Sequence, residues 1–377
     1  MLLQRLDPAA PSHDMASEDF LSGDLLSRLP PAGAPISFFE FWPGWLFYTP
    51  IVLYWIAMGL RHGDLSLPTA ANPRIETGGL CGESKSGILD MAGPLARRWI
   101  APYATFMSGN AEAAFAAMTE AGLSFPVVIK PDIGCNGTGV KKVDDATSLR
   151  SVVESFPSHT RLLVQELIDM PVEGGIFWMR EPGQPRGRIS SITYKEVPTL
   201  IGDGVATIED LVRRDRRTGR IPDLYLPRLK RRLHESPAAG ERVPLVFAGN
   251  HCKGSIFHDG RRDVTDALSR RLDDILSDVP EFHFGRIDLK ARSVSALRKG
   301  EDFRIIEING VGSEATHIWD GHTTLYEAYR AQFEHYGAAF RIAAANRARG
   351  WKSAGAWSLL RAWRRQKRLM RAYPLND

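Results

Sequence analysis

Cysteine is scarce in this sequence. The chain has three cysteines, Cys81, Cys135 and Cys252, and no two of them form a Cys-x-x-Cys pair. A sparse, odd number of cysteines is not expected of a disulfide-linked secreted domain or of a zinc module. His251, Cys252 and His258 also lack a standard zinc-ligand spacing. The sequence therefore predicts a protein of a reducing compartment, without disulfide bonds or a structural zinc site.

A strong net charge and a secretory signal are lacking too. The formal net charge is +4 over 377 residues, with the positive excess toward the carboxy terminus. Residues 1–35 contain Pro, Ser and Asp but no apolar core followed by a cleavage site, so we expect a disordered tail of a cytoplasmic protein. The hydrophobic fraction of 44% is that of a globular chain, here long enough for two or three domains.

Charged residues are absent from Phe41 to Leu60, a stretch of about the length that a bilayer-spanning helix needs. Two prolines and a glycine interrupt it, and its aromatic residues are of the type found at membrane interfaces. Three interpretations stay open: a shallow or re-entrant hairpin that contacts a membrane, a buried element of the fold, or a true span. We therefore treat residues 36–64 as a separate apolar segment.

A lysine and a glycine-rich loop follow a predicted strand at residues 125–131. Lys130 lies near the end of this strand, and three glycines occur between residues 134 and 139, before a second short strand. Glycines let backbone N–H groups approach a phosphate closely. The loop joins strand to strand and lacks a Gly-Lys-Ser/Thr ending, so it is neither a Walker loop nor a dinucleotide fingerprint. A phosphate-covering loop and a merely mobile hairpin both remain open.

Two predicted strands near the carboxy terminus, residues 286–290 and 304–309, carry the clearest candidate site. Alternate side chains of a strand share a face. If the strands pair, Asp288, Glu307 and Asn309 converge, with Arg286 beside them. Oxygen ligands of this kind suit Mg²⁺ that carries nucleotide phosphates. The alternative is an ordinary polar face of a half-exposed antiparallel sheet.

A third predicted strand, residues 161–168, contains a Gln-Glu-Leu-Ile sequence. Glu166 and the backbone around it are suited to meeting the edge of an adenine, with Leu167 and Ile168 against the ring. A plain core strand is an equally good interpretation. Two further strands are predicted at residues 173–180 and 188–195.

The order of these parts resembles the ATP-grasp ligases, especially the branch of D-alanine–D-alanine ligase and the ATP-grasp half of cyanophycin synthetase. Residues 201–211 resemble the Gly-Asp-Gly…Thr-Ile-x-x-Leu segment of the second enzyme. The resemblance covers about residues 80–336 and implies an α+β ATP-grasp fold, in which two α+β lobes clamp ATP. It implies a small lobe (123–198) and a large lobe with the metal site (199–338). Outside these lobes we expect an atypical amino-terminal domain (65–122) and a basic amphipathic helix (339–377).

The resemblance also assigns roles. Arg286, Lys130 and Lys195 would neutralise phosphate charge, and Asp288, Glu307 and Asn309 would bind Mg²⁺, in the form of two ions. Ser313 and His317 would face the substrate, as would Lys253 and Ser255. The residues implied to hold ATP are Lys130, Gly134, Asn136, Gly137, Thr138, Gly139, Gln165, Glu166, Leu167, Ile168, Glu173 and Lys195. Cys135-Asn136 replaces serines favoured in D-alanine–D-alanine ligases, and a proline after the metal residues is missing, so we expect a different acceptor pocket.

The activity implied by the resemblance is ATP-dependent activation of a carboxylate as an acyl phosphate, followed by attack of an amine. The partners would be a small carboxylate and a small amine, with no nucleic acid, because aromatic residues are scarcely interleaved with the arginines. An ATP-grasp kinase and a carboxylate–thiol ligase remain alternatives. A nucleotide-binding membrane module without turnover is disfavoured, since the charged groups of catalysis are all present.

Two basic stretches are left over. Residues 211–232 contain nine arginines and lysines, either a solvated surface or a lid for an acidic substrate. Residues 341–371 combine arginines with Trp351, Trp357 and Trp363, which is typical of a membrane-surface helix or of a helix packed on its domain with a charged outer face. Together with the apolar segment, these residues predict a peripheral association with the cytoplasmic face of a membrane.

Overall fold

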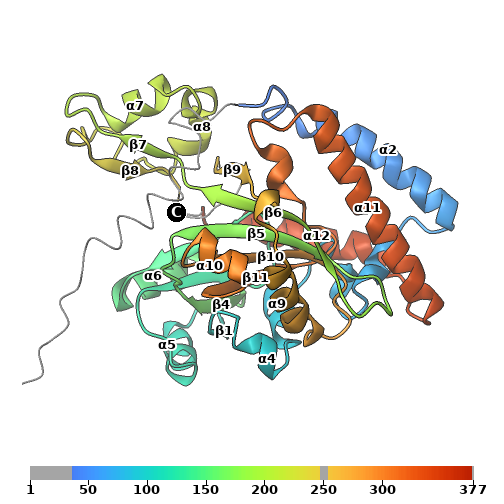
Figure 1. Ribbon diagram of the computed structural model, residues 1–377. Coiled ribbons are helices and arrows are strands. Elements are labelled where there is room, and N and C mark those ends of the chain that lie inside the picture. Colours follow the sequence, from blue (N-terminus) through green and yellow to red (C-terminus); the bar gives the residue numbers. More distant parts are fainter. Residues whose placement is uncertain (1–35, 247–253, 376–377) are drawn as a thin grey trace, which may run out of the picture.

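The computed structural model describes residues 36–246 and 254–375 (Figure 1). The predicted tail, residues 1–35, lies outside this range. Two antiparallel sheets, one of four strands and one of five, form the two lobes of the molecule.

The four-stranded sheet of the small lobe has the order β1-β4-β2-β3. Helices α5 and α6 pack on it, and each begins at a side-chain cap: Asn110 accepts hydrogen bonds from the first turn of α5, and Asp145 forms a capping box with Ser148 in α6. The elements are β1 (Tyr103–Met107), α5 (Ala111–Glu120), β2 (Val127–Pro131), β3 (Lys141–Val143), α6 (Ala146–Ser155) and β4 (Arg161–Glu166).

The lobe boundaries differ from those expected. Strand β1 pairs with β4, so residues 103–120 belong to the small lobe and not to a separate amino-terminal domain. Strands β5 and β6, expected in the small lobe, pair instead within the large sheet. The expected boundary at residue 338 falls inside the helix α11. These boundaries could not be read from the local sequence, because strand pairing and helix length depend on contacts between residues that are distant in sequence.

The five-stranded sheet of the large lobe has the order β11-β10-β5-β6-β9 and is buried on both faces. In β5, Ile176 and Trp178 point into one core, whereas Phe177 and Met179 point into the other, as the alternation of a strand requires. The strands are β5 (Val172–Met179), β6 (Arg188–Glu196), β9 (Ile256–Asp259), β10 (Phe284–Ala291) and β11 (Phe303–Asn309).

Helices cover both faces of this sheet. Helix α10 lies in the sequence between β10 and β11; Ser293 caps its start and Gly300 ends it at φ 71°. One face also has α3 (Lys85–Asp90), α4 (Pro94–Arg97), α9 (Asp266–Ser277) and α10 (Val294–Lys299), and the other has η1 (Leu67–Ala71) and α11 (Leu325–Ala348). Short 3-10 turns complete the lobe: η2 (Glu76–Gly79), η5 (Arg261–Asp263) and η6 (Thr316–Trp319).

A small unit with its own apolar core stands apart at the upper left of Figure 1. It contains the basic stretch 211–232 that the sequence analysis singled out. Its elements are β7 (Thr199–Ile201), α7 (Ile208–Arg214), η3 (Thr218–Arg220), α8 (Pro222–Tyr225) and β8 (Arg242–Pro244).

The apolar segment forms one helix, α2 (Gly44–His62), and not a hairpin. It lies beside α11 in Figure 1, with Trp55 against Tyr336 and Phe340 at ring-centroid distances of 5.4 and 5.3 Å. Throughout the ranges that the structure describes, no helix has the length and hydropathy to cross a bilayer. The last helix, α12 (Ala356–Ala372), returns to the small lobe, where Tyr373 contacts Phe156.

Candidate active site

A cavity of about 620 Å³ lies between the two lobes and receives side chains from both. It brings together sixteen of the residues that the sequence singled out. They are Lys130, Gly134, Asn136, Gly137, Thr138, Gln165, Glu166, Leu167, Ile168, Glu173, Lys195, Arg286, Asp288, Glu307, Asn309 and Ser313.

The strand pair β10–β11 sets the acidic end of the cavity. Asp288 is directly opposite Glu307, and Arg286 is opposite Asn309, so the expected convergence of these side chains is observed. Arg286 donates two hydrogen bonds to Asp288, of 2.9 and 3.0 Å, and the Asn309 amide donates a third of 3.2 Å. Burial would raise the pKa of Asp288, but the charges of Arg286 and Lys195 outweigh burial and lower it to about 2. Asp288 is therefore a carboxylate at neutral pH.

Three buried lysines face these carboxylates. Lys130 reaches across from the small lobe and donates to Gln165 Oε1 at 2.7 Å and to the backbone oxygen of Ile306 at 2.9 Å. Burial lowers the pKa of Lys130 to about 8, with the nearby Glu307 opposing that shift. Lys195 lies 3.4 Å from Glu173 and 3.3 Å from Asp288. Lys130 thus joins the two lobes through the backbone oxygen of Ile306, whereas the ion pairs of Lys195 lie within the large lobe.

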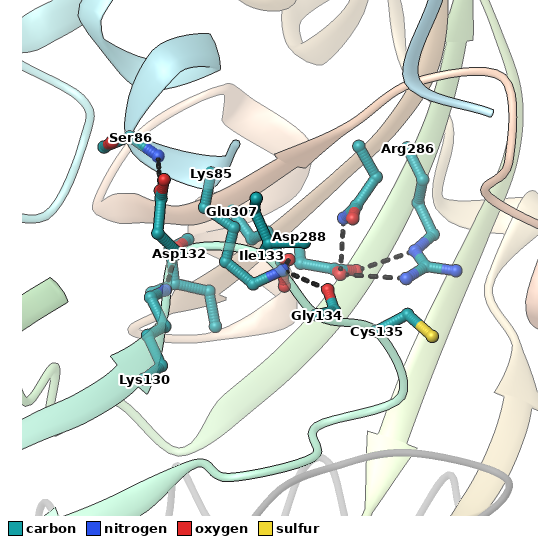
Figure 2. A network of polar contacts seen from close by, with 12 residues as sticks. Lys85, Ser86, Lys130, Asp132, Ile133, Gly134, Cys135, Arg286, Asp288 and Glu307 are labelled. Carbon is teal, nitrogen blue, oxygen red and sulfur yellow. Dashed lines mark hydrogen bonds and ion pairs between the residues drawn. The ribbon is translucent and has the colours of Figure 1, made fainter. Parts of the chain in front are cut away.

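The third lysine, Lys85, was not among the predicted site residues. Its Nζ lies 2.9 Å from Glu307 Oε1 and donates to the Gly134 oxygen at 2.7 Å, so it joins β11 to the glycine-rich loop. Figure 2 shows this contact. The only local signal was Lys85 at the start of a helix after a glycine-rich turn, and that signal does not reveal a partner more than 200 residues away.

Helix α3 is fixed to the same loop by Asp132. The Asp132 carboxylate accepts from the Ser86 backbone N–H at 2.8 Å (Figure 2). It also accepts from the Ser84 hydroxyl at 2.7 Å. The Lys85 backbone N–H also donates to the backbone oxygen of Asp132 at 3.0 Å. The first turn of α3 and the base of the glycine-rich loop therefore behave as one unit.

The donor set at this end of the cavity fits Mg²⁺. Asp288 and Glu307 supply carboxylate oxygens and Asn309 supplies an amide oxygen, and Mg²⁺ usually takes one or two carboxylates together with phosphates. In residues 36–246 and 254–375, no three His, Cys, Asp or Glu side chains form a metal cluster by themselves. The two carboxylates are instead paired with Arg286 and Lys85.

The aromatic end of the cavity adjoins the acidic one: it is centred on Glu314, which was not among the predicted site residues and whose backbone oxygen accepts from Arg286 at 3.1 Å. Glu314 accepts hydrogen bonds from Tyr48 at 2.9 Å, from Trp319 Nε1 at 2.6 Å and from Gln332. Tyr48 and Trp319 line the cavity with Tyr336. Tyr48 comes from α2, so the apolar segment contributes directly to this site.

Some of the expected substrate residues lie elsewhere. Ser313 lines the cavity and donates to the Gly310 oxygen at 2.5 Å. His317 and Ser255 are buried outside the cavity lining, and burial lowers the pKa of His317 to about 4. Gly139 also lies outside the lining, and Lys253 falls outside the described residues.

Helix α12 covers the glycine-rich loop from outside. Gln366 lines the cavity, accepts from the Gly82 N–H at 2.5 Å and donates to Cys135 Sγ at 3.2 Å. Tyr373 donates to the Ile133 oxygen at 2.9 Å. The basic carboxy-terminal helix is therefore packed on its domain, one of the two interpretations that its sequence allowed.

The basic stretch 211–232 lies away from the cavity lining. Its Arg217 is buried and paired with Glu40, next to the aromatic segment before α2. The remaining arginines of this stretch are mostly exposed or half-buried, as a solvated surface would be.

Comparison with known proteins identifies the fold. The model of the RimK-like ATP-grasp domain matches residues 90–176, which include β1 to β4 and the start of β5. These residues form an ATP-grasp domain, and the predicted ATP-grasp resemblance and α+β fold are confirmed. No curated protein sequence matches the chain.

Solved structures of similar backbone path include three ligases. A bifunctional glutathione synthetase of Pasteurella multocida has 16% identity and a TM-score of 0.35, over 66% of this chain and 36% of that one. The D-Ala:D-Ser ligase of Enterococcus faecalis has 15% identity and a TM-score of 0.39, over 70% and 63%. The D-alanine–D-alanine ligase of Bacillus anthracis has 15% identity and a TM-score of 0.41, over 74% and 71%. The chain thus spans about a third of the first structure and under two thirds of the second.

Proposed function

Starting from an ATP-grasp domain, we propose that the protein is an ATP-dependent ligase that activates a carboxylate as an acyl phosphate and joins it to an amine. The observation that supports this most is the convergence of Lys130, Lys195 and Arg286 on Asp288 and Glu307 in one cavity between two lobes. Such a cavity can gather the negative charges of a nucleotide and a carboxylate in one place.

Each cation has a distinct place in this reaction. Lys130, from the small lobe, is near enough to the large lobe to bind a phosphate that lies between them. Arg286 and Lys195 face the same carboxylate, Asp288, and would exchange part of that contact for the transferred phosphoryl group. Fixing several cations around the phosphoryl group positions it for in-line attack and stabilises its charge.

Asp288, Glu307 and Asn309 are the residues proposed to hold Mg²⁺, as two ions. When bound, the metal would neutralise the negative charge that develops on the phosphate groups. Glu166, Leu167 and Ile168 would meet adenine, and Glu173 the ribose. The glycine-rich loop, with Asn136, Gly137 and Thr138, would cover the phosphates and exclude water from the acyl phosphate.

The aromatic end around Glu314 is the proposed substrate side. A carboxylate fixed by three donors is well placed to attract the ammonium group of an amine substrate, and the aromatic rings beside it would exclude water. The test is ATP-dependent phosphate release with pooled amino acids and metabolites, followed by fractionation to the active pair. Release that needs one carboxylate and one amine together supports the proposal; release with a hydroxyl or thiol acceptor supports the kinase or the carboxylate–thiol ligase.

A nucleotide-binding module without turnover remains the alternative from another class, and the presence of all five charged groups disfavours it. We also propose that the protein is cytoplasmic and peripheral to a membrane, on the strength of its sparse cysteines and the exposed apolar residues of α2. Recovery of the whole protein in the soluble fraction of a low-salt lysate would count against the membrane association.

A further inference from the structure

Helix α2 presents an apolar face to its surroundings. One side packs on α11 through the buried Phe47 and Ile51. The other side, here named the α2 stripe, consists of Trp45 (73% exposed), Leu46 (39%), Val52 (53%), Leu53 (61%), Ile56 (41%) and Leu60 (72%). A continuous exposed apolar surface of this kind marks an interaction site.

The stripe offers a partner almost no hydrogen-bonding groups. Thr49, the polar residue within it, donates its hydroxyl to the Trp45 oxygen at 2.6 Å, inside the helix itself. Elsewhere on α2, Trp55 Nε1 donates to the Leu65 oxygen at 2.9 Å and Tyr48 donates to Glu314. Protein interfaces carry about one hydrogen bond per 100–200 Å². Apart from the Trp45 indole N–H and the Thr49 hydroxyl, the stripe is apolar over a helix of 19 residues, about 28 Å long, and such a surface is better matched to hydrocarbon.

The charges at the ends of the stripe match a lipid surface. Helix α2 contains no Asp or Glu, and its last turn carries Arg61 and His62. Arg347 of α11 is exposed beside this end and donates to the His62 oxygen at 3.2 Å. At the other end, Phe38 and Trp45 are exposed aromatic residues of the type found at the headgroup level. Arginine at one end suits anionic headgroups.

The packing of α2 fixes its orientation. Because one side is held on α11 along its length, the helix can lie in the interface with its stripe in the acyl boundary, but it cannot cross the bilayer. Tyr48 is one turn from Trp45 and Val52 and lines the substrate end of the cavity. A membrane under the stripe would therefore lie beside the entrance to that end.

We propose that the α2 stripe docks on an anionic bilayer and that the substrate taken at the Glu314 end is an amphiphile whose apolar chain remains in the membrane. The substrate part of this inference rests on the ligase proposed above. The docking part stands on the stripe alone, so the two parts can fail separately.

Docking is tested by flotation of the full chain with phosphatidylcholine vesicles, with and without phosphatidylglycerol. The expected result is flotation that phosphatidylglycerol strengthens and that the double variant Leu53→Glu, Ile56→Glu weakens roughly a hundredfold, from the loss of two buried apolar side chains. Val205→Glu, at a site 82% exposed on the distant small unit, is the matched control and should float like the wild type. A wild type that does not float, or a double variant that floats equally well, overturns the proposal. So does a wild-type dimer in light scattering that the double variant converts to monomers, since a second copy would then cover the stripe.

The substrate class is tested by phosphate release with a total lipid extract or with a water-soluble metabolite pool. We expect the lipid extract to stimulate phosphate release by the wild type but not by the double variant. Stimulation of phosphate release by the soluble pool alone overturns the proposal that the substrate is an amphiphile. Binding of a non-hydrolysable ATP analogue distinguishes a defect in membrane docking from a failure of the proposed ligase. If the double variant binds the analogue normally, its defect lies in docking, whereas absence of binding and of phosphate release in the wild type means that the proposed ligase itself has failed.

Discussion

Lys85 and Glu307 form an ion pair of 2.9 Å that joins the amino-terminal helix α3 to the last strand of the large sheet. The same ammonium donates to the Gly134 oxygen. A single side chain thus connects the glycine-rich loop with a proposed metal ligand. Binding of Mg²⁺ at Glu307 would compete with this pair, so the loop and the metal residue are expected to respond to each other.

We expect Lys85→Met to lower the free energy of unfolding of the nucleotide-free protein by about 2 kcal/mol, because Glu307 then keeps a largely buried charge with one partner fewer. Mg²⁺ with a non-hydrolysable ATP analogue should restore part of that loss. Urea unfolding followed by circular dichroism measures both effects. Lys142→Met, which removes a more exposed pair with Asp144, is the control and should change stability by less than about 0.5 kcal/mol. Equal effects of the two substitutions would refute the coupling.

Asp288→Asn and Glu307→Gln should each reduce ATP-dependent phosphate release at least about a hundredfold, because each removes a charge proposed to hold the metal against the phosphates. Asp144→Asn, on the exposed edge of the small lobe, should leave release unchanged. Circular dichroism must show that the variants are folded. Full activity in either folded variant would remove that residue from the proposed metal site.

Gln366→Ala should loosen the glycine-rich loop, because it removes contacts of α12 with Gly82 and Cys135. Amide hydrogen exchange of residues 134–139 should become faster, and affinity for the ATP analogue should fall roughly threefold to tenfold. Arg368→Ala, on the exposed side of α12, should change neither quantity. Unchanged exchange in Gln366→Ala would mean that α12 does not restrain the loop.

His335 predicts a pH dependence of stability. It is buried beside Phe177 and within 2.9 Å of the Ser190 hydroxyl, and burial, with smaller effects of His317 and Arg188, lowers its pKa to about 3. In the unfolded chain the His335 imidazole has its ordinary pKa near 6.5. Below that pH the unfolded chain therefore binds a proton at His335 that the folded chain does not bind. The free energy of unfolding should therefore fall as the pH drops from about 6.5 toward 3, by up to about 1.4 kcal/mol per unit from this group.

Replacement of the imidazole isolates that contribution. His335→Gln should be less stable than the wild type at pH 7, because it loses packing against Phe177. Its stability should nevertheless fall less steeply between pH 6.5 and 4. Parallel curves for the two proteins, from chemical unfolding at a series of pH values, would show that His335 is not the titrating group.

Local patterns in the sequence predicted the strands of the site well. The alternation of Ile and polar residues around Asp288 and Glu307 indicated two strands with a shared polar face, and the structure pairs them in that register. Contacts between distant residues were beyond such patterns. The pairing of β1 with β4, which moves residues 103–120 into the small lobe, and the reach of Lys85 to Glu307 both depend on the path of the whole chain.

Other errors came from signals with more than one meaning. Helix α10, within residues 291–303, is not among the expected elements, although Ser293 and Gly300 are ordinary helix-capping residues and bound it. The aromatic run before residue 60 left membrane contact and burial both open. Helix α2 packs one side on the fold and exposes the other, so membrane contact stays a prediction. Glu314 gave no signal, since its role depends on donors from three separate elements.

In the function that we propose, one cavity between the lobes clamps a magnesium-loaded adenine nucleotide. Calorimetric titration of the protein with a non-hydrolysable ATP analogue, in the presence and absence of Mg²⁺, tests it most directly. The account predicts saturable binding at one site that requires Mg²⁺ and is lost in both Lys130→Met and Asp288→Asn, one from each lobe. No binding by the wild type, or undiminished binding by both variants, would contradict it.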